Sequence, residues 1–400
     1  MIKKKQLKEP QNTPVGSVAL SSRQKKAVIY QVIAVLLVLF AVYYCTSNML
    51  DNIAKRGITT GFGFLSDTAG FGISQYLINY SDSTSNYLDV FIVGILNTAM
   101  VSIVCIVMAS ILGLLIGIGR LSNNFLIAKL SLVYIETFRN IPVLLQILFW
   151  YNVVLSALPN PRSSMGYLDA IFLNNRGLLL PAPIFESGSI FILIAFLLAC
   201  VGVFFLSKWA IKRHNVTGEE FPLIPVSLSI LILAPVLVYF ISGQPVSAEY
   251  PVLKGFNFKG GLTVIPEFLA LAFALSIYTA TYIAEAVRAG ISSIPNGQTE
   301  AAESLGLRGT VTMRKLILPQ ALRVIIPPVI NQYLNMVKNS SLATAIGYPE
   351  LVTLFSGTTL NQVGQAIEII LMTMAVYLTF SIVISMLLNW VNKKMEIKGR

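Results

Sequence analysis

Charged residues are scarce in this 400-residue chain, since Lys, Arg, Asp and Glu make up only 12% of it and hydrophobic residues make up 55%. A soluble domain carries about a quarter charged residues. With a mean hydropathy of +0.73, the composition therefore excludes a single water-soluble core. It predicts an all-α protein that crosses a lipid bilayer several times.

Histidine and cysteine are also rare. The single histidine, His214, lies in a basic segment, and the three cysteines, Cys45, Cys105 and Cys200, each lie inside an apolar run. Their spacing predicts no metal site and no disulfide, and it leaves no ligand cluster or thiol–imidazole pair for catalysis. The chain also lacks a Walker A sequence, so ATP hydrolysis is not expected of it alone. We predict a protein that is not an enzyme, with no catalytic residues.

Long uncharged runs predict eight crossings, because about twenty apolar residues span the hydrocarbon of a bilayer. Pro142 is expected to kink the third crossing. Only fourteen uncharged residues separate Arg323 from Lys338, and they include Pro327 and Pro328, so the seventh crossing is expected to be broken or re-entrant. The predicted crossings are 27–50, 90–119, 131–158, 187–207, 221–242, 266–288, 323–347 and 365–391.

The distribution of basic residues predicts the orientation of these crossings. Of the 29 Lys and Arg residues, 21 fall on the side that holds both termini and 6 fall in the loops on the other side. Excess basic residues mark the cytoplasmic side, so we predict cytoplasmic tails at 1–26 and 392–400 and a periplasmic loop at 51–89. The net charge of +11 is thereby explained by topology, and nucleic acid is not a predicted partner.

Five charged side chains inside predicted crossings are candidates for function: Glu136, Arg139, Glu285, Arg288 and Lys338. A charge at the bilayer centre costs about 2.5–3.5 kcal/mol on insertion scales, so each is expected to be paired or to face a cavity. These groups are candidates for a path that meets the carboxylate or ammonium of a substrate. The alternative is structural, since each Glu–Arg pair is three residues apart on one helix face and is placed to form an ion pair.

The stretch 300–319 is a polar island between two apolar segments. It predicts two short helices separated by a break. Asn296 or Thr299 is expected to cap the first helix, with the carboxylates of the stretch near its N-terminal end. Gly306 is expected to end that helix in a left-handed conformation, and Pro319 is expected to limit the second helix.

The same stretch resembles the cytoplasmic coupling loop of ABC importer permeases. In that family the pattern is Glu-Ala-Ala, three residues, Gly, nine residues, Ile, one residue and Leu-Pro. The chain departs from it only at the Ile position, where it has Leu. The matching residues, which the resemblance implies contact an ATPase, are Glu300, Ala301, Ala302, Gly306, Leu316, Leu318 and Pro319.

Further segments resemble permeases of the polar amino-acid ABC importers, and the length is similar to that of the general L-amino-acid permeases. The similar segments are 94–98, 134–142, 282–288 and 338–342. The resemblance divides the chain into the tail 1–26, a first crossing 27–50, a loop 51–89, a permease domain 90–391 and the tail 392–400, with an insertion at about 159–264 and the coupling loop at 289–323.

The resemblance implies a type I ABC importer permease core in a bacterial inner membrane. A periplasmic amino-acid-binding protein would deliver substrate, a second and different permease would complete the path, and cytoplasmic subunits would bind ATP and Mg²⁺, with no cofactor in this chain. Two alternatives stay open. One is an ABC permease for another small solute, and the other is a secondary transporter driven by an ion gradient.

Overall fold

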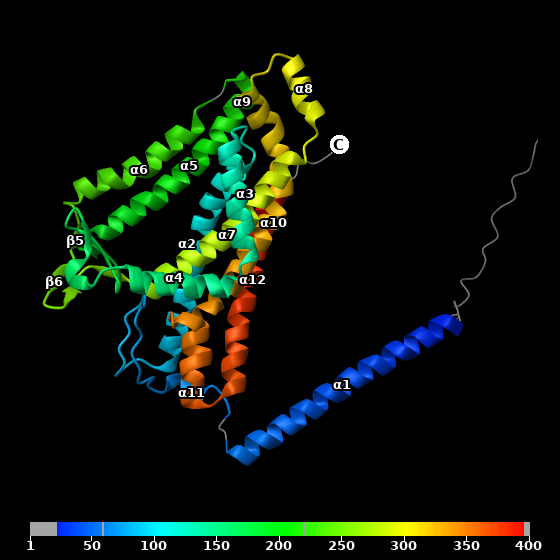
Figure 1. Ribbon diagram of the computed structural model, residues 1–400, viewed down its shortest axis with the longest axis vertical. Helices are drawn as coiled ribbons and strands as arrows, with labels where there is room; N and C mark the ends of the chain where they lie inside the picture. Colours follow the sequence, from blue (N-terminus) through cyan, green and yellow to red (C-terminus); the bar gives the residue numbers. More distant parts are fainter. Residues whose placement is uncertain (1–21, 58–59, 220, 396–400) are drawn as a thin grey trace, which may run out of the picture. The chain divides into compact units, whose positions relative to one another are not determined.

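The structure is a computed structural model that describes residues 22–57, 60–219 and 221–395 (Figure 1). The chain divides into two compact units, Met1–Gly61 and Phe62–Arg400. Most of the first predicted tail and the end of the last one lie outside the described residues.

In its described residues, the first unit contains one helix, α1 (Ser22–Arg56). Its stretch Lys26–Met49 is long and apolar enough to cross a membrane, and none of that stretch is buried within the protein. A helix that is apolar on every side needs lipid or another protein around it. The helical nature of the first predicted crossing is thereby confirmed, although α1 continues six residues beyond residue 50.

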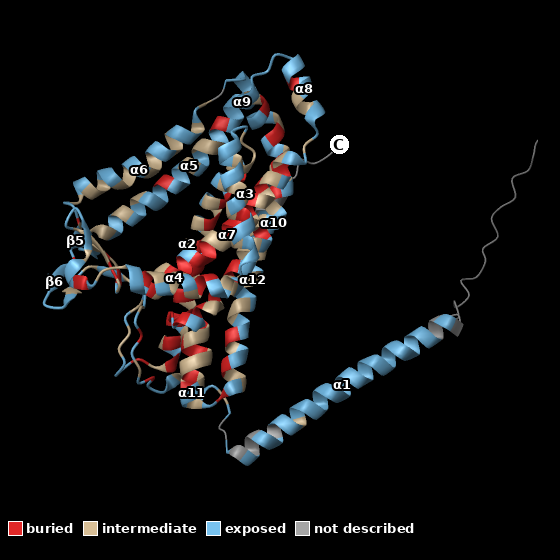
Figure 2. Cartoon of the chain, viewed as in Figure 1, coloured by how far each residue is buried: buried red, intermediate tan, exposed pale blue. Residues whose placement is uncertain are grey.

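The core of the second unit is built around α7 (Pro266–Ser292), which packs against α2 (Tyr87–Arg120), α10 (Leu318–Asn339) and α4 (Val143–Ala157). Figure 2 shows buried residues concentrated along α2 and α7. The two helices approach closely at glycines of α2. A Cβ atom added to Gly113 would lie 2.6 Å from the Cβ of Ile283, and one added to Gly117 would lie 2.8 Å from the carbonyl oxygen of Ala284.

The third predicted crossing is two helices, α3 (Phe125–Asn140) and α4, bent by 104° relative to each other. We expected one kinked helix, but the chain breaks into two separate helices at this point. Ile141 is extended, with φ −92° and ψ 127°, because the ring of a following proline disfavours the helical conformation. Counting the bent pair as one crossing gives seven candidate spans among the described residues, and six without it, so the predicted number of eight is not confirmed.

The inserted segment forms two α-helices, the 3₁₀ helix η2 (Pro161–Ser163) and eight short strands within its described residues, and the strands were not expected from the sequence. Helices α5 (Ser189–Thr217) and α6 (Leu223–Ile241) pack against each other. One sheet has the antiparallel order β1-β2-β3-β8, and β4–β5 and β6–β7 form two-stranded ribbons. The strands are β1 (Met165–Tyr167), β2 (Ile171–Asn174), β3 (Gly177–Leu180), β4 (Ala182–Phe185), β5 (Val246–Glu249), β6 (Val252–Lys254), β7 (Asn257–Lys259) and β8 (Leu262–Val264).

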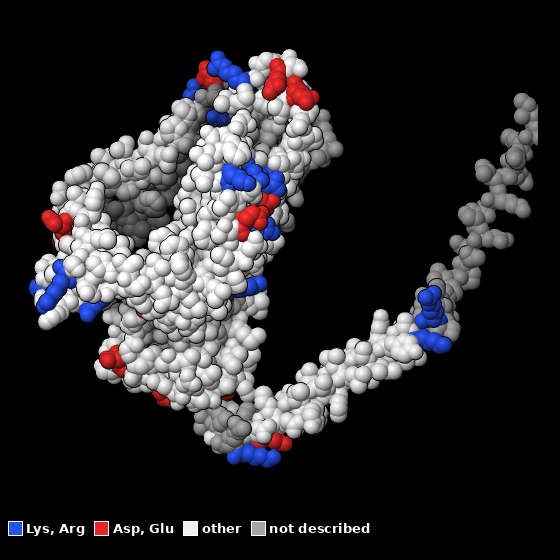
Figure 3. Space-filling view, viewed as in Figure 1, with Lys and Arg blue, Asp and Glu red and all other residues white. Residues whose placement is uncertain are grey.

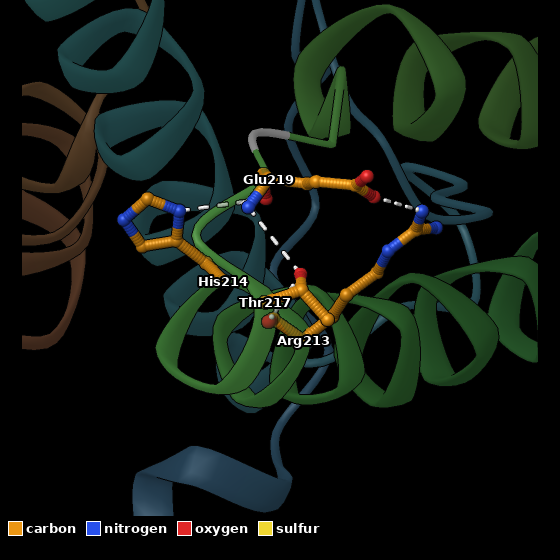
Figure 4. A network of polar contacts seen from close by, with 4 residues as sticks. All are labelled: Arg213, His214, Thr217 and Glu219. Carbon is orange, nitrogen blue, oxygen red and sulfur yellow. Dashed lines mark hydrogen bonds and ion pairs between the residues drawn. The ribbon is translucent and has the colours of Figure 1, made fainter.

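The basic segment around His214, which lies between the predicted crossings 187–207 and 221–242, continues α5. No glycine or proline lies between residue 208 and Gly218, which adopts φ +74° and donates its N–H to the His214 carbonyl at 2.9 Å. Figure 4 shows the turn that follows. There Arg213 and Glu219 form an ion pair at 2.6 Å, Glu219 N–H donates to Thr217 Oγ1 at 3.3 Å, and the His214 ring lies 3.4 Å from the Glu219 carbonyl oxygen.

The seventh predicted crossing contains a break, but not at its prolines. Helix α10 runs through Pro327 and Pro328 and ends at Asn339. A 3₁₀ helix, η4 (Ser340–Ile346), follows, and Gly347 at φ +73° ends it. The chain then forms a π-helix, η5 (Val352–Thr359), and the short helix α11 (Leu360–Val363) before the last crossing, α12 (Ala366–Met395).

Candidate functional site

The first separate helix of the expected coupling loop is α8 (Asn296–Ser304), which follows the end of α7 after residues 293–295. Neither Asn296 nor Thr299 caps it. The N-cap residue is Pro295, which has no side-chain acceptor, and no acidic residue lies in the first turn. The helix begins earlier than expected, so Glu300 lies in its middle, and the predicted stabilisation of carboxylates by the helix N-terminus is absent.

The end of α8 follows the prediction. Gly306 adopts φ +71° and donates its N–H to the Glu303 carbonyl at 2.8 Å, while Leu307 N–H donates to the Ala302 carbonyl at 3.1 Å. This pair of bonds is the Schellman arrangement, in which a left-handed residue satisfies the last carbonyls of a helix. Gly306 therefore sets the direction in which the chain leaves α8.

The second helix does not stop at Pro319. Helix α9 (Gly309–Thr312) continues through a π-helical turn, η3 (Met313–Ile317), directly into α10, where Pro319 is the second residue. Proline lacks an N–H and crowds the carbonyl four residues before it. The wider π turn lies where that crowding would occur, which is why the helical path continues.

Two hydrogen bonds between side chains connect α8, on one side of the loop, to the start of α10, on the other. The Gln298 amide donates to Gln320 Oε1 at 3.1 Å, and the Gln320 amide donates to Gln298 Oε1 at 2.6 Å. Ala302 is 3% exposed and therefore faces the protein, whereas Glu300 and Ala301 are exposed. Acidic side chains on α8 lie at one end of the second unit in Figure 3.

The exposed part of the loop is partly apolar. Leu305 is 79% exposed and Leu307 is 43% exposed. Of the remaining predicted coupling residues, Leu318 and Pro319 are exposed and Leu316 is partly buried. A fixed helix that ends in exposed leucines and carries carboxylates is a surface suited to another protein rather than to water alone.

Among the described residues, the five charged candidates inside crossings form one ion pair with one another. Arg288 donates to Glu285 at 2.6 Å and 3.0 Å through two of its nitrogens, as predicted. Glu136 and Arg139 do not form the ion pair that their spacing on one helix face predicted. Instead the Arg139 guanidinium lies over the Tyr282 ring, 5.2 Å from its centroid, because Arg139 is in the last turn of α3 and reaches across to α7.

Lys338 lies apart from these groups. It is exposed in the last turn of α10, and within the described part of the chain it forms no ion pair. It lines a groove of about 690 Å³ between the end of α10, η5 and α12. The polar residues that line the groove with it are Ser341, Ser356, Thr373, Tyr377 and Ser381.

Glu350, which no sequence pattern had singled out, lies beside this groove and is fully buried. Its carboxylate accepts hydrogen bonds from the backbone of Val352 and Thr353 at 2.8 Å and 2.7 Å and from the Tyr377 hydroxyl at 2.9 Å. Glu350 thus joins the start of η5 to α12. One sequence feature could have indicated this role. Glu350 is an acidic residue just before the start of a helix, where carboxylates cap backbone N–H groups.

Comparisons with known proteins agree on one kind of protein. Residues 221–397 match the family described as "Binding-protein-dependent transport system inner membrane component". The chain is 50% identical to the "Putative amino-acid ABC transporter permease protein YhdX" of Escherichia coli, over 97% of this chain and 99% of that protein.

Two further relatives carry more specific names. The "General L-amino acid transport system permease protein AapQ" of Rhizobium johnstonii is 47% identical, over 96% of this chain and 95% of its own length. The "Glutamate/glutamine/aspartate/asparagine transport system permease protein BztB" of Rhodobacter capsulatus is 38% identical, over 94% of this chain and 95% of its own length. The similarity therefore extends over the insertion as well as the rest of the chain.

Proposed function

Because this chain belongs to the amino-acid permeases of binding-protein-dependent ABC transporters, we propose that it is one membrane subunit of an ATP-driven importer of L-amino acids. The single observation that carries the proposal is the full-length similarity to permeases named for general L-amino acid transport and for transport of glutamate, glutamine, aspartate and asparagine. The helical, apolar second unit is consistent with a subunit of an inner membrane.

The coupling loop is proposed to contact a cytoplasmic ATP-binding subunit, which would hold ATP and Mg²⁺. Glu300, Ala301 and Gly306 would meet the partner on the exposed side of α8, while Leu316, Leu318 and Pro319 would hold the second side of the loop. The support is geometric. The loop is the direct continuation of α7, the most buried candidate span of the second unit, so a force applied at α8 acts on a helix that packs against α2, α4 and α10.

The substrate path is proposed to run past Lys338 and along the face that carries Arg139 and the Glu285–Arg288 pair, with Glu136 near its end. Lys338 supports this best, since it is a cation without an ion pair in the described residues and it lines a groove that also presents hydroxyl groups. A substrate carboxylate is the group that such a cation would bind.

Three features of the assembly are part of the proposal. A periplasmic amino-acid-binding protein docks on the side opposite α8. A second, different permease completes the path and makes a heterodimer. Both termini lie in the cytoplasm, since 21 of the 29 basic residues fall on their side of the predicted topology, and basic residues favour that side.

The test is affinity purification of the tagged chain from its native host, followed by mass spectrometry and then by uptake of labelled glutamate and glutamine. We expect an ATP-binding subunit with a Walker A sequence and a second permease to co-purify. Uptake of a different solute class by the same complex would replace the substrate assignment. A chain that purifies alone and moves solute under an ion gradient without ATP would overturn the proposal.

A further inference from the structure

The corner between α3 and α4 leaves backbone groups that its own helices do not satisfy. Within a continuous helix the Phe138 carbonyl would accept from the N–H of residue 142, but Pro142 has no N–H. The chain turns by 104° at this point. The carbonyl of Ile141, which is extended at the break, also lies outside both helices.

Gln146 supplies the missing donors. Its side-chain nitrogen donates to the Phe138 carbonyl at 2.8 Å and to the Ile141 carbonyl at 2.9 Å. The residue is 4% exposed, and its own backbone N–H donates to the Pro142 carbonyl at 3.2 Å. One side chain on the first turn of α4 therefore bonds the end of α3 and the residue at the break.

This contact needs a hydrogen-bond donor. Both bonds use the Gln146 nitrogen, and within the described residues its side-chain oxygen Oε1 has no hydrogen-bond partner. A carboxylate of the same shape would place an acceptor against two carbonyl oxygens, and leucine would offer neither carbonyl a donor.

The corner also fixes the position of a charged group. Arg139 lies two residues before Ile141, and its guanidinium is 5.2 Å from the centre of the Tyr282 ring on α7. One turn earlier, the Tyr134 hydroxyl donates to the Ile277 carbonyl at 2.8 Å. Beyond the corner, Ile147 is fully buried and belongs to the same core as α7. A change in the corner would therefore move Arg139 relative to Tyr282.

We propose that Gln146 is a positioning residue of the transport path, which locks the α3–α4 corner and thereby holds the Arg139 guanidinium over Tyr282. This inference rests on the proposed function, in which Arg139 lines the path. It adds to that function a residue that is buried and acts only through the backbone carbonyls it binds.

The first experiment measures the corner itself. Spin labels at Leu130 on α3 and Phe149 on α4, both about 60% exposed, are introduced in a cysteine-free version of the assembled transporter. The distance between them is measured by pulsed electron spin resonance. Full straightening would lengthen it by about 10 Å at 1.5 Å per residue. We expect Gln146→Leu and Gln146→Glu to broaden or lengthen the distribution.

The matched control is Asn152→Asp, which makes the same amide-to-acid change on an exposed residue of the same helix, where the amide bonds only the Leu148 carbonyl one turn earlier. It should leave the distance unchanged. If Gln146→Glu and Gln146→Leu give the same distances as this control, Gln146 does not lock the corner and the proposal is wrong.

The second experiment tests whether Gln146 acts through Arg139. We expect Gln146→Leu and Arg139→Gln each to lower ATP-driven uptake about tenfold, which corresponds to about 1.4 kcal/mol. We expect the double variant to be no slower than the slower single variant, because two residues that act through one group are not additive.

A double variant slowed by the product of the two single effects, about a hundredfold, would overturn the positioning role. Unchanged uptake with Arg139→Gln would do the same, and the proposed importer would stand without Arg139 in its path. If the wild-type transporter shows no ATP-driven amino-acid uptake, the proposed function itself fails, and the spin-label distances alone then decide whether Gln146 locks the corner.

Discussion

Replacement of Gly306 is predicted to weaken contact with the ATP-binding subunit in a graded way. A Cβ atom there would meet nothing within 4 Å, so the whole penalty comes from the backbone at φ +71°. A side chain in the left-handed region costs about 1–2 kcal/mol, which disfavours the native cap by a factor of about 5–30. The effect should rise from Gly306→Asn, since Asn tolerates this conformation, through Gly306→Ala to Gly306→Val.

Gly309 provides the matched control. It lies three residues further along the same loop, a Cβ atom added to it would also meet nothing within 4 Å, and it is not among the glycines with positive φ, so Gly309→Ala should be neutral. The assay is the fraction of ATP-binding subunit that stays on the purified permease, together with uptake. If Gly306→Val retains the subunit and transports as well as Gly309→Ala, the reasoning about this cap is refuted.

Three further outcomes are expected. Glu350→Ala should lower the free energy of unfolding by about 2–4 kcal/mol, because it leaves two partly buried backbone donors unpaired, and thermal unfolding of the purified chain measures this. Gly117→Ala should destabilise the α2–α7 contact by about 1–3 kcal/mol through overpacking, whereas Gly202→Ala in α5, with nothing within 4 Å, should be neutral or slightly stabilising; unfolding midpoints compare the two. Lys338→Gln should reduce uptake about tenfold through loss of a charged hydrogen bond, without changing the unfolding midpoint.

Much of the helical architecture could be predicted because the bilayer limits the choice of structure. A long uncharged run in a membrane protein forms a helix in which every backbone group is satisfied, so α2, α6, α7 and α12 follow their sequence patterns closely. The cap at Gly306 was predictable for a local reason, since glycine is the residue that best tolerates a left-handed helix end.

The strands and the corner depend on tertiary contacts that a local pattern does not contain. Strand β3 pairs with β8, more than eighty residues away, across the insertion's two helices. The size of the bend at Pro142 depends on Gln146, whose amide can replace a missing backbone donor only after the chain has turned. Proline alone indicates a kink or a break, and it does not give the angle.

In the candidate site, too, some features follow from the local sequence and others depend on tertiary contacts. Spacing gives the set of proposed coupling residues, but the partner of Arg139 lies on another helix, and Glu350 is recognisable as buried only from its contacts with η5 and α12. Pro319, Pro327 and Pro328 were each given too strong a helix-breaking effect. Their helix continues, with a π turn before the first of them and a break only after Asn339.

The measurement that tests the central claim most directly is uptake of labelled glutamate and glutamine by vesicles that contain the purified complex. The binding protein is added on one side and ATP on the other. The account predicts uptake that requires both, and that is lost when the Walker A lysine of the ATP-binding subunit is replaced. Uptake by this chain alone, driven by an ion gradient and indifferent to ATP, would contradict it.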